Sequence, residues 1–181
     1  MNRQIVISGV GGQGVLFITR LLAQAFMDGG SPVLTSETHG MAQRGGIVIS
    51  HLKGGDFQSP LIRPGHADLL IALKTETLDQ HCGFLKQNGE AVVNAANGAV
   101  AGRGLEGITI KTVDADRLAE TDNSPGSVNL YMLGAALSLG SICSVDSVKE
   151  QVRLRLAKKE EIVVQSALSA LDRGFSAVNE S

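Results

Sequence analysis

A short apolar run near the start of the chain leads directly into a glycine-rich turn. Gln4–Ser8 has the β-branched, continuously apolar character of a buried parallel strand, and Gly9-Val-Gly-Gly-Gln-Gly14 follows it. Apolar residues then recur every three or four positions, which predicts a helix from about Gly12 to Asp28. Pro32–Ser36 is the next predicted strand. This strand, helix and strand form a βαβ unit, for which a right-handed crossover is expected.

The rest of the chain continues this alternation. Strands are predicted at 47–53, 68–73, 91–94 and 108–113, with 57–62 as a hairpin partner of 47–53. A helix is predicted from Thr75 to Leu85, with Thr75 as its N-cap, and three more at 128–139, 145–156 and 160–175. The pattern predicts a single α/β domain over residues 1–181. Its fold class is a mainly parallel, Rossmann-like three-layer sheet with helices on both faces, a short antiparallel hairpin and a helical C-terminal third.

Composition excludes several classes of function. The formal net charge is −2 and aromatic residues make up 3% of the 181 residues, so neither a basic patch nor stacking platforms for nucleic acid are expected. The two cysteines, Cys82 and Cys143, are too few to ligate an iron–sulfur cluster, and no metal site is expected. No apolar stretch has the length of a membrane span or of a signal peptide, so a cytoplasmic location is expected.

The spacing Gly9-x-Gly11-x-x-Gly14 matches a dinucleotide-binding fingerprint, because glycines let the backbone approach a pyrophosphate at a helix N-terminus. Glu37 stands where a ribose-binding acid is expected. A stand-alone NAD(P)- or FAD-binding oxidoreductase is therefore one hypothesis, and a small-molecule sensor is a weaker one. Gln13 inside the turn and the lack of a recognisable hydride-transfer group weigh against the oxidoreductase hypothesis.

The segment Glu37–Gly46 is polar, rich in glycine and without apolar periodicity, so it is predicted to be a loop. It combines an acid, an imidazole, an amide and a guanidinium, a mixture suited either to a subunit interface or to a small anionic ligand. Arg44 could hold a phosphate or carboxylate with two hydrogen bonds. Asn129, at the start of a helix rich in small residues, is a candidate either for a hydrogen bond at the helix end or for an interface contact, and the interface contact is favoured.

Several motifs in the same order resemble the gamma subunit of the 2-oxoacid:ferredoxin oxidoreductases, of the pyruvate, ketoisovalerate and indolepyruvate types. These motifs are the glycine turn up to Val15, Ser36-Glu-Thr-His-Gly-Met-Ala-Gln-Arg-Gly-Gly46, Ser59-Pro-Leu-Ile62, Ala67-Asp68 and Asn129-Leu-Tyr-Met-Leu-Gly-Ala135. The resemblance covers about Ile5 to Leu139. The string around Gln43-Arg44 is much more specific than the glycine turn.

The resemblance implies a subunit of a complex that oxidatively decarboxylates a 2-oxoacid to an acyl-CoA. Thiamine diphosphate, magnesium and iron–sulfur clusters are then expected on alpha, beta and ferredoxin-like delta subunits, or on a fused alpha-beta subunit, with ferredoxin as electron acceptor. A homodimer is a further option. This chain is expected to hold no tightly bound cofactor, to carry no catalytic residue, and to serve assembly and the approach of coenzyme A or substrate. The candidate cofactor-binding or interface residues are Gly9, Gly11, Gly12, Gln13, Gly14, Glu37, His39, Gly40, Met41, Gln43, Arg44, Gly45, Gly46 and Asn129.

Overall fold

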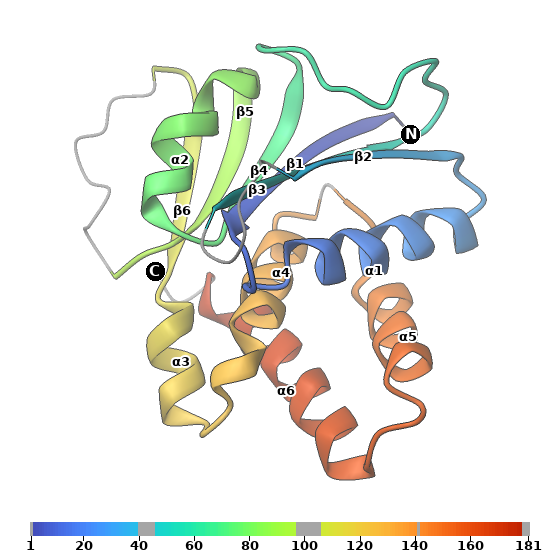
Figure 1. Cartoon of the computed structure of the whole chain (residues 1–181), viewed down its shortest axis with the longest axis vertical. Coiled ribbons are helices and arrows are strands. Elements are labelled where there is room, and N and C mark those ends of the chain that lie inside the picture. The colour runs from blue at the N-terminus through green and yellow to red at the C-terminus, as the bar shows by residue number, and fades with distance from the viewer. Residues whose placement is uncertain (1, 40–45, 97–105, 141, 179–181) are drawn as a thin grey trace.

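A single six-stranded sheet forms the centre of the computed structural model, which describes residues 2–39, 46–96, 106–140 and 142–178 (Figure 1). The strands lie in the order β2-β3-β1-β4-β5-β6. They are β1 Arg3–Val10, β2 Val33–His39, β3 Ile47–Gly54, β4 Ala67–Ala72, β5 Leu85–Asn94 and β6 Thr109–Val113. The helices are α1 Val15–Asp28, α2 Thr75–His81, α3 Ala115–Thr121, α4 Val128–Ser138, α5 Val145–Arg155 and α6 Glu161–Ala177, with short 3-10 turns at Cys82–Phe84 and Pro125–Ser127.

The sheet is mainly parallel, as the sequence predicts. β1, β4, β5 and β6 pair in parallel, while β3 runs antiparallel to both β1 and β2. β1 and β2 therefore run in the same direction, as a βαβ unit requires, but β3 lies between them. The antiparallel hairpin consists of β2 and β3 rather than of β3 and residues 57–62.

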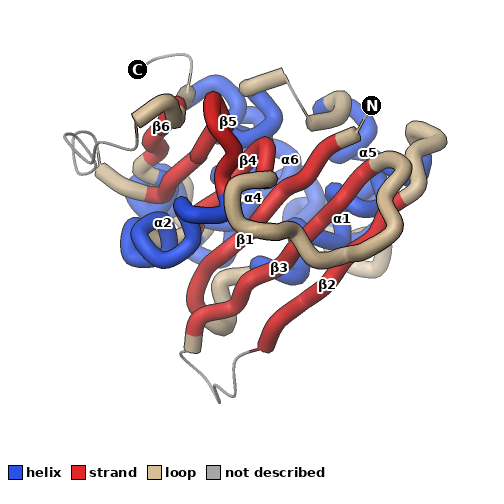
Figure 2. Tube along the Cα trace, turned by 90° about the horizontal axis from the view of Figure 1, so that it is seen from above, coloured by secondary structure: helices blue, strands red, loops and turns tan. Residues whose placement is uncertain are grey.

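The predicted strand at 57–62 is wrong. Pro60 lacks the N–H group that a ladder needs, and the segment instead runs as a loop over one face of the sheet (Figure 2). Ile62 anchors this loop in the core, where its side chain is 3% exposed. The loop and α2 together cover this face, which we call the outer face.

Side chains alternate along β1 between two hydrophobic clusters, one on each face of the sheet. Val6 packs on the outer face, with Leu70, Leu78 and Ala91. Ile5 and Ile7 pack on the other face, under α1 and α4. Residues Asn129–Leu137 of α4 are all buried, because the helix is covered by the sheet on one side and by α6 on the other. Helices thus lie on both faces, as expected, with most of them on one.

Several predicted boundaries differ from the structure. The helix at Thr75 ends at His81, and residues through Phe84 form a 3-10 turn before Leu85 starts β5. Lys74 rather than Thr75 is the N-cap, and the Thr75 hydroxyl donates to the carbonyl of Asn94 at 3.3 Å. The first helix starts at Val15 instead of Gly12. The structure also contains a helix that was not predicted, α3, which has only seven residues and Asp114 as its N-cap.

Candidate functional site

The glycine turn is closed on the inside by its own glutamine. The backbone N–H of Val10 donates to Gln13 Oε1 at 2.7 Å, and Gln13 Nε2 donates to the carbonyl of Leu73 at 3.4 Å. Gly12 and Gly14 have φ of +98° and +82°, values that favour glycine. Gln13 therefore supports the turn and ties it to the end of β4, so its side chain is structural at this position.

β3 covers one side of the turn. The pairing of β1 with β3 continues to Val10 and Ile47, and the N–H of Gly11 donates to the carbonyl of Gly46 at 2.8 Å. The N–H of Gln13 also donates to the carbonyl of Val10, at 3.0 Å. The amides of Val10, Gly11 and Gln13 are therefore already used by the protein itself. In a dinucleotide-binding sheet, the ligand crosses the edge of the sheet at this point, between β1 and the neighbouring parallel strand. Here the neighbouring strand is the antiparallel β3.

Asn129 lies against the other side of the turn. A β-carbon on Gly14 would be 2.0 Å from Asn129 Nδ2, so the two residues are in direct contact. The Asn129 side chain is 8% exposed, yet it makes no hydrogen bond with any group in the part of the chain that the structure describes. This buried amide thus has unused hydrogen-bonding capacity beside the turn.

The N-terminus of α1 is open to an anion. Gly14 is its N-cap, no side chain caps it, and its first turn contains no acid. The first amides of a helix lack intrahelical partners and carry a partial positive charge. Two hollows flank them, one of about 250 Å³ lined by Gly12, Gly14 and Leu16, and one of about 490 Å³ that includes Asn129 and Phe17.

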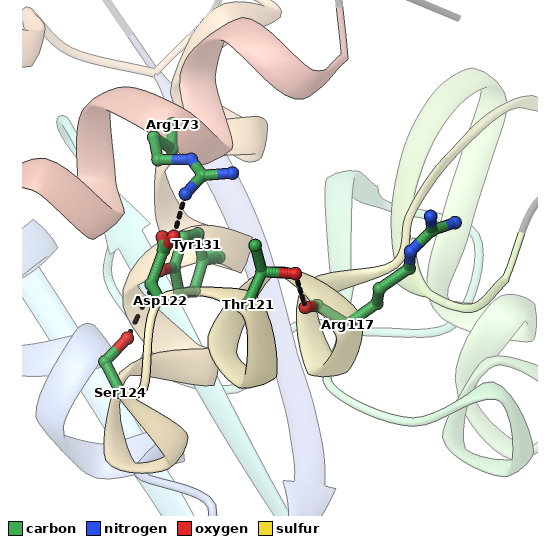
Figure 3. A network of polar contacts seen from close by, with 6 residues as sticks. All are labelled: Arg117, Thr121, Asp122, Ser124, Tyr131 and Arg173. Atoms are coloured by element: carbon green, nitrogen blue, oxygen red, sulfur yellow. Dashed lines mark hydrogen bonds and ion pairs between the residues drawn. The ribbon is translucent and has the colours of Figure 1, made fainter.

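A polar network fixes the start of α4 and with it Asn129 (Figure 3). The hydroxyl of Tyr131 donates to a carboxylate oxygen of Asp122 and lies 3.2 Å from the hydroxyl of Ser124. Arg173 of α6 forms an ion pair with the same carboxylate. The network joins the end of α3, the turn before α4 and α6. Ser124, which also lines the larger hollow, is a residue that the sequence analysis did not select.

The predicted loop Glu37–Gly46 begins later than expected. Residues 37–39 belong to β2, where Glu37 pairs with Ser50 of β3 and His39 with Val48. Because β3 separates β2 from β1, Glu37 is two strands away from the glycine turn and does not occupy the ribose-binding position of the fingerprint. Five candidates lie outside the described residues, namely Gly40, Met41, Gln43, Arg44 and Gly45. Among the described residues, the fold brings together Gly9, Gly11, Gly12, Gln13, Gly14, Gly46 and Asn129.

The titratable groups with shifted pKa values lie away from this site. Burial, then the charges of His81 and Lys53, lower the pKa of His51, which is buried on the outer face against Phe84. Burial also lowers the pKa of His81. Burial raises the pKa of the Cys143 thiol to about 11, so this thiol is a poor nucleophile. No helix among the described residues has the length and apolar character needed to cross a membrane.

The fold and the glycine turn define an α/β domain of the Rossmann-like class, modified by an inserted antiparallel strand. The chain belongs to the pyruvate ferredoxin/flavodoxin oxidoreductase family, whose model matches residues 4–177. This match confirms the resemblance inferred from the sequence. The chain is accordingly of the gamma-subunit type found in 2-oxoacid:ferredoxin oxidoreductases.

Three similar proteins contain this domain, either as nearly the whole chain or as about a third of a longer one. The indolepyruvate oxidoreductase subunit IorB of Archaeoglobus fulgidus is 33% identical, over 97% of this chain and 95% of that protein. The ketoisovalerate oxidoreductase subunit VorA of Methanothermobacter thermautotrophicus is 27% identical over 88% of this chain but only 33% of that protein. A 2-oxoglutarate:ferredoxin oxidoreductase from Magnetococcus marinus, solved with 2-oxoglutarate, coenzyme A and succinyl-CoA bound, shares the fold (TM-score 0.86, 24% identity, 99% of this chain and 31% of that chain).

Proposed function

We propose that this chain is the gamma subunit of a cytoplasmic complex that oxidatively decarboxylates a 2-oxoacid to an acyl-CoA and passes the electrons to ferredoxin. The family match over residues 4–177 carries this proposal. Thiamine diphosphate, magnesium and iron–sulfur clusters are assigned to the alpha, beta and delta subunits, or to a fused alpha-beta subunit. Two cysteines in the whole sequence are too few for a cluster of this chain's own. The isolated chain is therefore expected to be inactive.

The contribution of this chain to the reaction is a site for the phosphates of coenzyme A. The open N-terminus of α1 supplies backbone N–H donors and a partial positive charge, and the amide of Asn129, which bonds no other described residue, lies in contact with Gly14. We call this arrangement, formed by Gly12, Gly14, the first turn of α1 and Asn129, the anion shelf. Its polar groups suit an anion and include no titratable side chain, which agrees with a binding role rather than proton transfer.

Coenzyme A, when bound, supplies the thiol that accepts the acyl group. The shelf fits its phosphates because it offers donors without a competing carboxylate in the first turn of α1. The hollows beside the shelf, of about 250 and 490 Å³, give access on both sides of Gly14. The residues of this chain would then hold and orient the phosphate-bearing part, while the other subunits carry out the chemistry.

The test compares two substitutions at Asn129 in the assembled complex. Asn129→Leu removes the amide at nearly the same volume, and Asn129→Asp replaces it with a negative charge. The KM for coenzyme A should rise about tenfold for Asn129→Leu and further for Asn129→Asp, since losing a hydrogen bond to a charged group costs about 1.5 kcal/mol and like charges repel. The KM for the 2-oxoacid should stay unchanged. An unchanged KM for coenzyme A in both intact complexes would exclude the shelf.

Arg44 gives an independent test of the role in assembly. It lies outside the described residues, so the prediction rests on its place in the Gln43-Arg44-Gly45-Gly46 string. Arg44→Ala should weaken co-purification with the larger subunits if its guanidinium contacts them. A complex that forms equally well without this guanidinium would show that Arg44 has no part in assembly.

A further inference from the structure

Exposed apolar side chains gather on the helical side of the molecule. Five large apolar residues among those described are strongly exposed, and four of them belong to three helices that pack together: Met27 at the end of α1, Leu154 in α5, and Ile162 and Val163 at the start of α6. Their side chains are 48, 60, 74 and 43% exposed, respectively. Single exposed apolar residues are common, but a group that lines connected hollows is typical of an interaction surface.

Two grooves meet at Phe17 and contain these four residues. One, of about 530 Å³, lies between α1 and α5 and includes Met27 and Leu154. The other is the hollow of about 490 Å³ that contains Asn129, and it includes Ile162 and Val163. We call the surface formed by Phe17, Met27, Leu154, Ile162 and Val163 the docking face. The helices α1, α5 and α6 that carry it are neighbours on the same side of the sheet (Figure 1).

The groove between α1 and α5 is positively charged. Arg20 and Arg155 line it and are exposed, and no carboxylate of the described residues forms an ion pair with either. Asp28, in the same groove, is already bonded by two amides: Gln24 Nε2 donates to it at 2.9 Å, and Gln151 Nε2 donates to its other oxygen. The groove therefore offers guanidinium groups to a partner with carboxylates beside its apolar residues.

We propose that the docking face binds the larger subunit of the complex, meaning the alpha subunit or the fused alpha-beta subunit, through an apolar segment of that subunit flanked by Asp or Glu. This inference rests on the proposed function and adds the surface that serves it. In the Methanothermobacter and Magnetococcus proteins described above, this domain matches 33 and 31% of a longer chain. In IorB of Archaeoglobus fulgidus it matches 95% of the protein, so there the domain is a separate subunit without a covalent link. Such a subunit must hold its partner through a buried surface, for which about 800 Å² per partner is usual.

The position of the docking face supports the same partner. Its second groove is lined in part by Asn129, which contacts Gly14 of the glycine turn. A subunit seated on this face would therefore also border the anion shelf. A ligand on the shelf would then lie between two chains, as a shared active site requires.

A second copy of this chain is a poorer occupant. In a symmetric dimer the same surface meets itself, so Arg20 and Arg155 of one copy would lie in the same interface as those of the other. Like charges brought together in an interface disfavour association. A larger subunit with carboxylates at this position meets no such repulsion.

The experiment places a carboxylate on the docking face and, as a control, on the opposite side of the molecule. Leu154→Glu and Ile162→Glu change the docking face, while Leu61→Glu changes a residue that is 53% exposed in the loop over the outer face. Each variant is expressed together with the other subunits, and the affinity of the purified chain for them is measured by titration. All three positions are exposed, so circular dichroism and thermal melting should show the fold of the wild type.

Leu154→Glu and Ile162→Glu should weaken assembly about 100-fold or more, because a carboxylate would be buried against apolar groups or other carboxylates, and Leu61→Glu should have no effect. Equal assembly of all three variants would overturn the docking face while leaving the proposed function intact. Failure of the wild-type chain to bind any of the other subunits of the oxidoreductase would overturn both the docking face and the proposed function. Light scattering that shows a dimer of the isolated chain, split by Leu154→Glu, would make a second copy the occupant and also overturn the proposal.

Discussion

The amide nitrogen of Asn129 lies 2.0 Å from the point that a β-carbon on Gly14 would occupy. Two motifs far apart in the sequence, the glycine turn and the start of α4, are therefore in contact. The residue at each of the two positions limits which side chains fit at the other. Gly14 is held to glycine both by its φ of +82° and by this contact. Gly12, with a φ of +98° and open space around its Cα, has only the first restriction.

This difference predicts separate costs for two alanine substitutions. Gly12→Ala should lower the free energy of unfolding by about 1–2 kcal/mol, the cost of a left-handed conformation. Gly14→Ala should cost more, because the methyl group also displaces Asn129. Urea denaturation measures both. In an Asn129→Ala background the cost of Gly14→Ala should fall to that of Gly12→Ala, and equal costs in both backgrounds would contradict the contact.

The crossing of α4 and α6 predicts a larger effect. A β-carbon on Gly134 would lie 2.0 Å from the carbonyl oxygen of Leu171, and one on Gly174 would lie 2.0 Å from that of Tyr131. Backbone atoms cannot move aside, so Gly134→Ala or Gly174→Ala should lower stability by about 3 kcal/mol or prevent folding. Gly83→Ala, at a position with open space, is the control and should stay near wild type by thermal melting.

The network at the start of α4 predicts a measurable role for the single tyrosine of the chain. Tyr131→Phe removes the hydroxyl that donates to Asp122, at a residue that is 1% exposed. The free energy of unfolding should fall by about 1.5 kcal/mol, as for hydrogen bonds to charged groups. Thr121, whose hydroxyl donates to the carbonyl of Arg117 on the exposed side of α3, provides the comparison. Thr121→Ala should change stability by no more than about 0.5 kcal/mol in the same urea titration.

Stability should depend on pH through His51. Burial, with the nearby charges of His81 and Lys53, lowers the pKa of His51 in the folded chain below its ordinary 6.5. The unfolded chain therefore binds a proton first as the pH falls. The contribution of neutral His51 to the free energy of unfolding should be fully present above about pH 7. As the pH falls from 6.5 to the pKa of His51 in the folded chain, the free energy of unfolding should decline by up to about 1.4 kcal/mol per pH unit for this group.

His51→Leu removes this titration and should flatten the decline between pH 7 and pH 5. The remaining slope would include His81, whose pKa burial also lowers. His66→Gln, at an exposed imidazole, controls for the loss of a histidine elsewhere. An undiminished slope in His51→Leu would show that His51 does not carry the dependence.

The sequence was sufficient for the parts of the fold that local patterns determine. β1, β4 and α6 follow from apolar runs and from a period of three to four residues, and both signals lie within a single element. The place of β3 between β1 and β2 depends on pairing between distant segments, which no local pattern contains. The loop at 57–62 had the length of a strand, and Pro60 was the signal against it. α3 is too short to show a period, although Asp114 before it was a readable cap.

The candidate site was predicted only in part, because local motifs are readable in the sequence whereas contacts between distant segments are not. The glycine turn is a local motif, and its position between β1 and α1 agrees with the expectation. Glu37 was assigned to the turn because a second strand normally lies beside the first, and the inserted β3 removes that neighbour. Asn129 was selected as an interface contact, while the structure shows it in contact with Gly14 inside the same chain. That contact depends on the packing of α4 against α1, β4 and β5, which only the tertiary structure reveals.

The position of β3 also has a consequence for the order of folding. β3 pairs with β1 from Arg3 to Val10 and with β2 from Val33 to His39, so neither pairing can form before residues 47–54 have been synthesised. β2 and β3 are consecutive and antiparallel, and hairpins of this kind form within about 1–10 μs. We expect the hairpin to form first and to add to β1 as a unit. α1 must then span two strand spacings, about 10 Å, instead of one. The packing of α1 across the sheet thus sets the distance between β1 and β2, and β3 fits into this space.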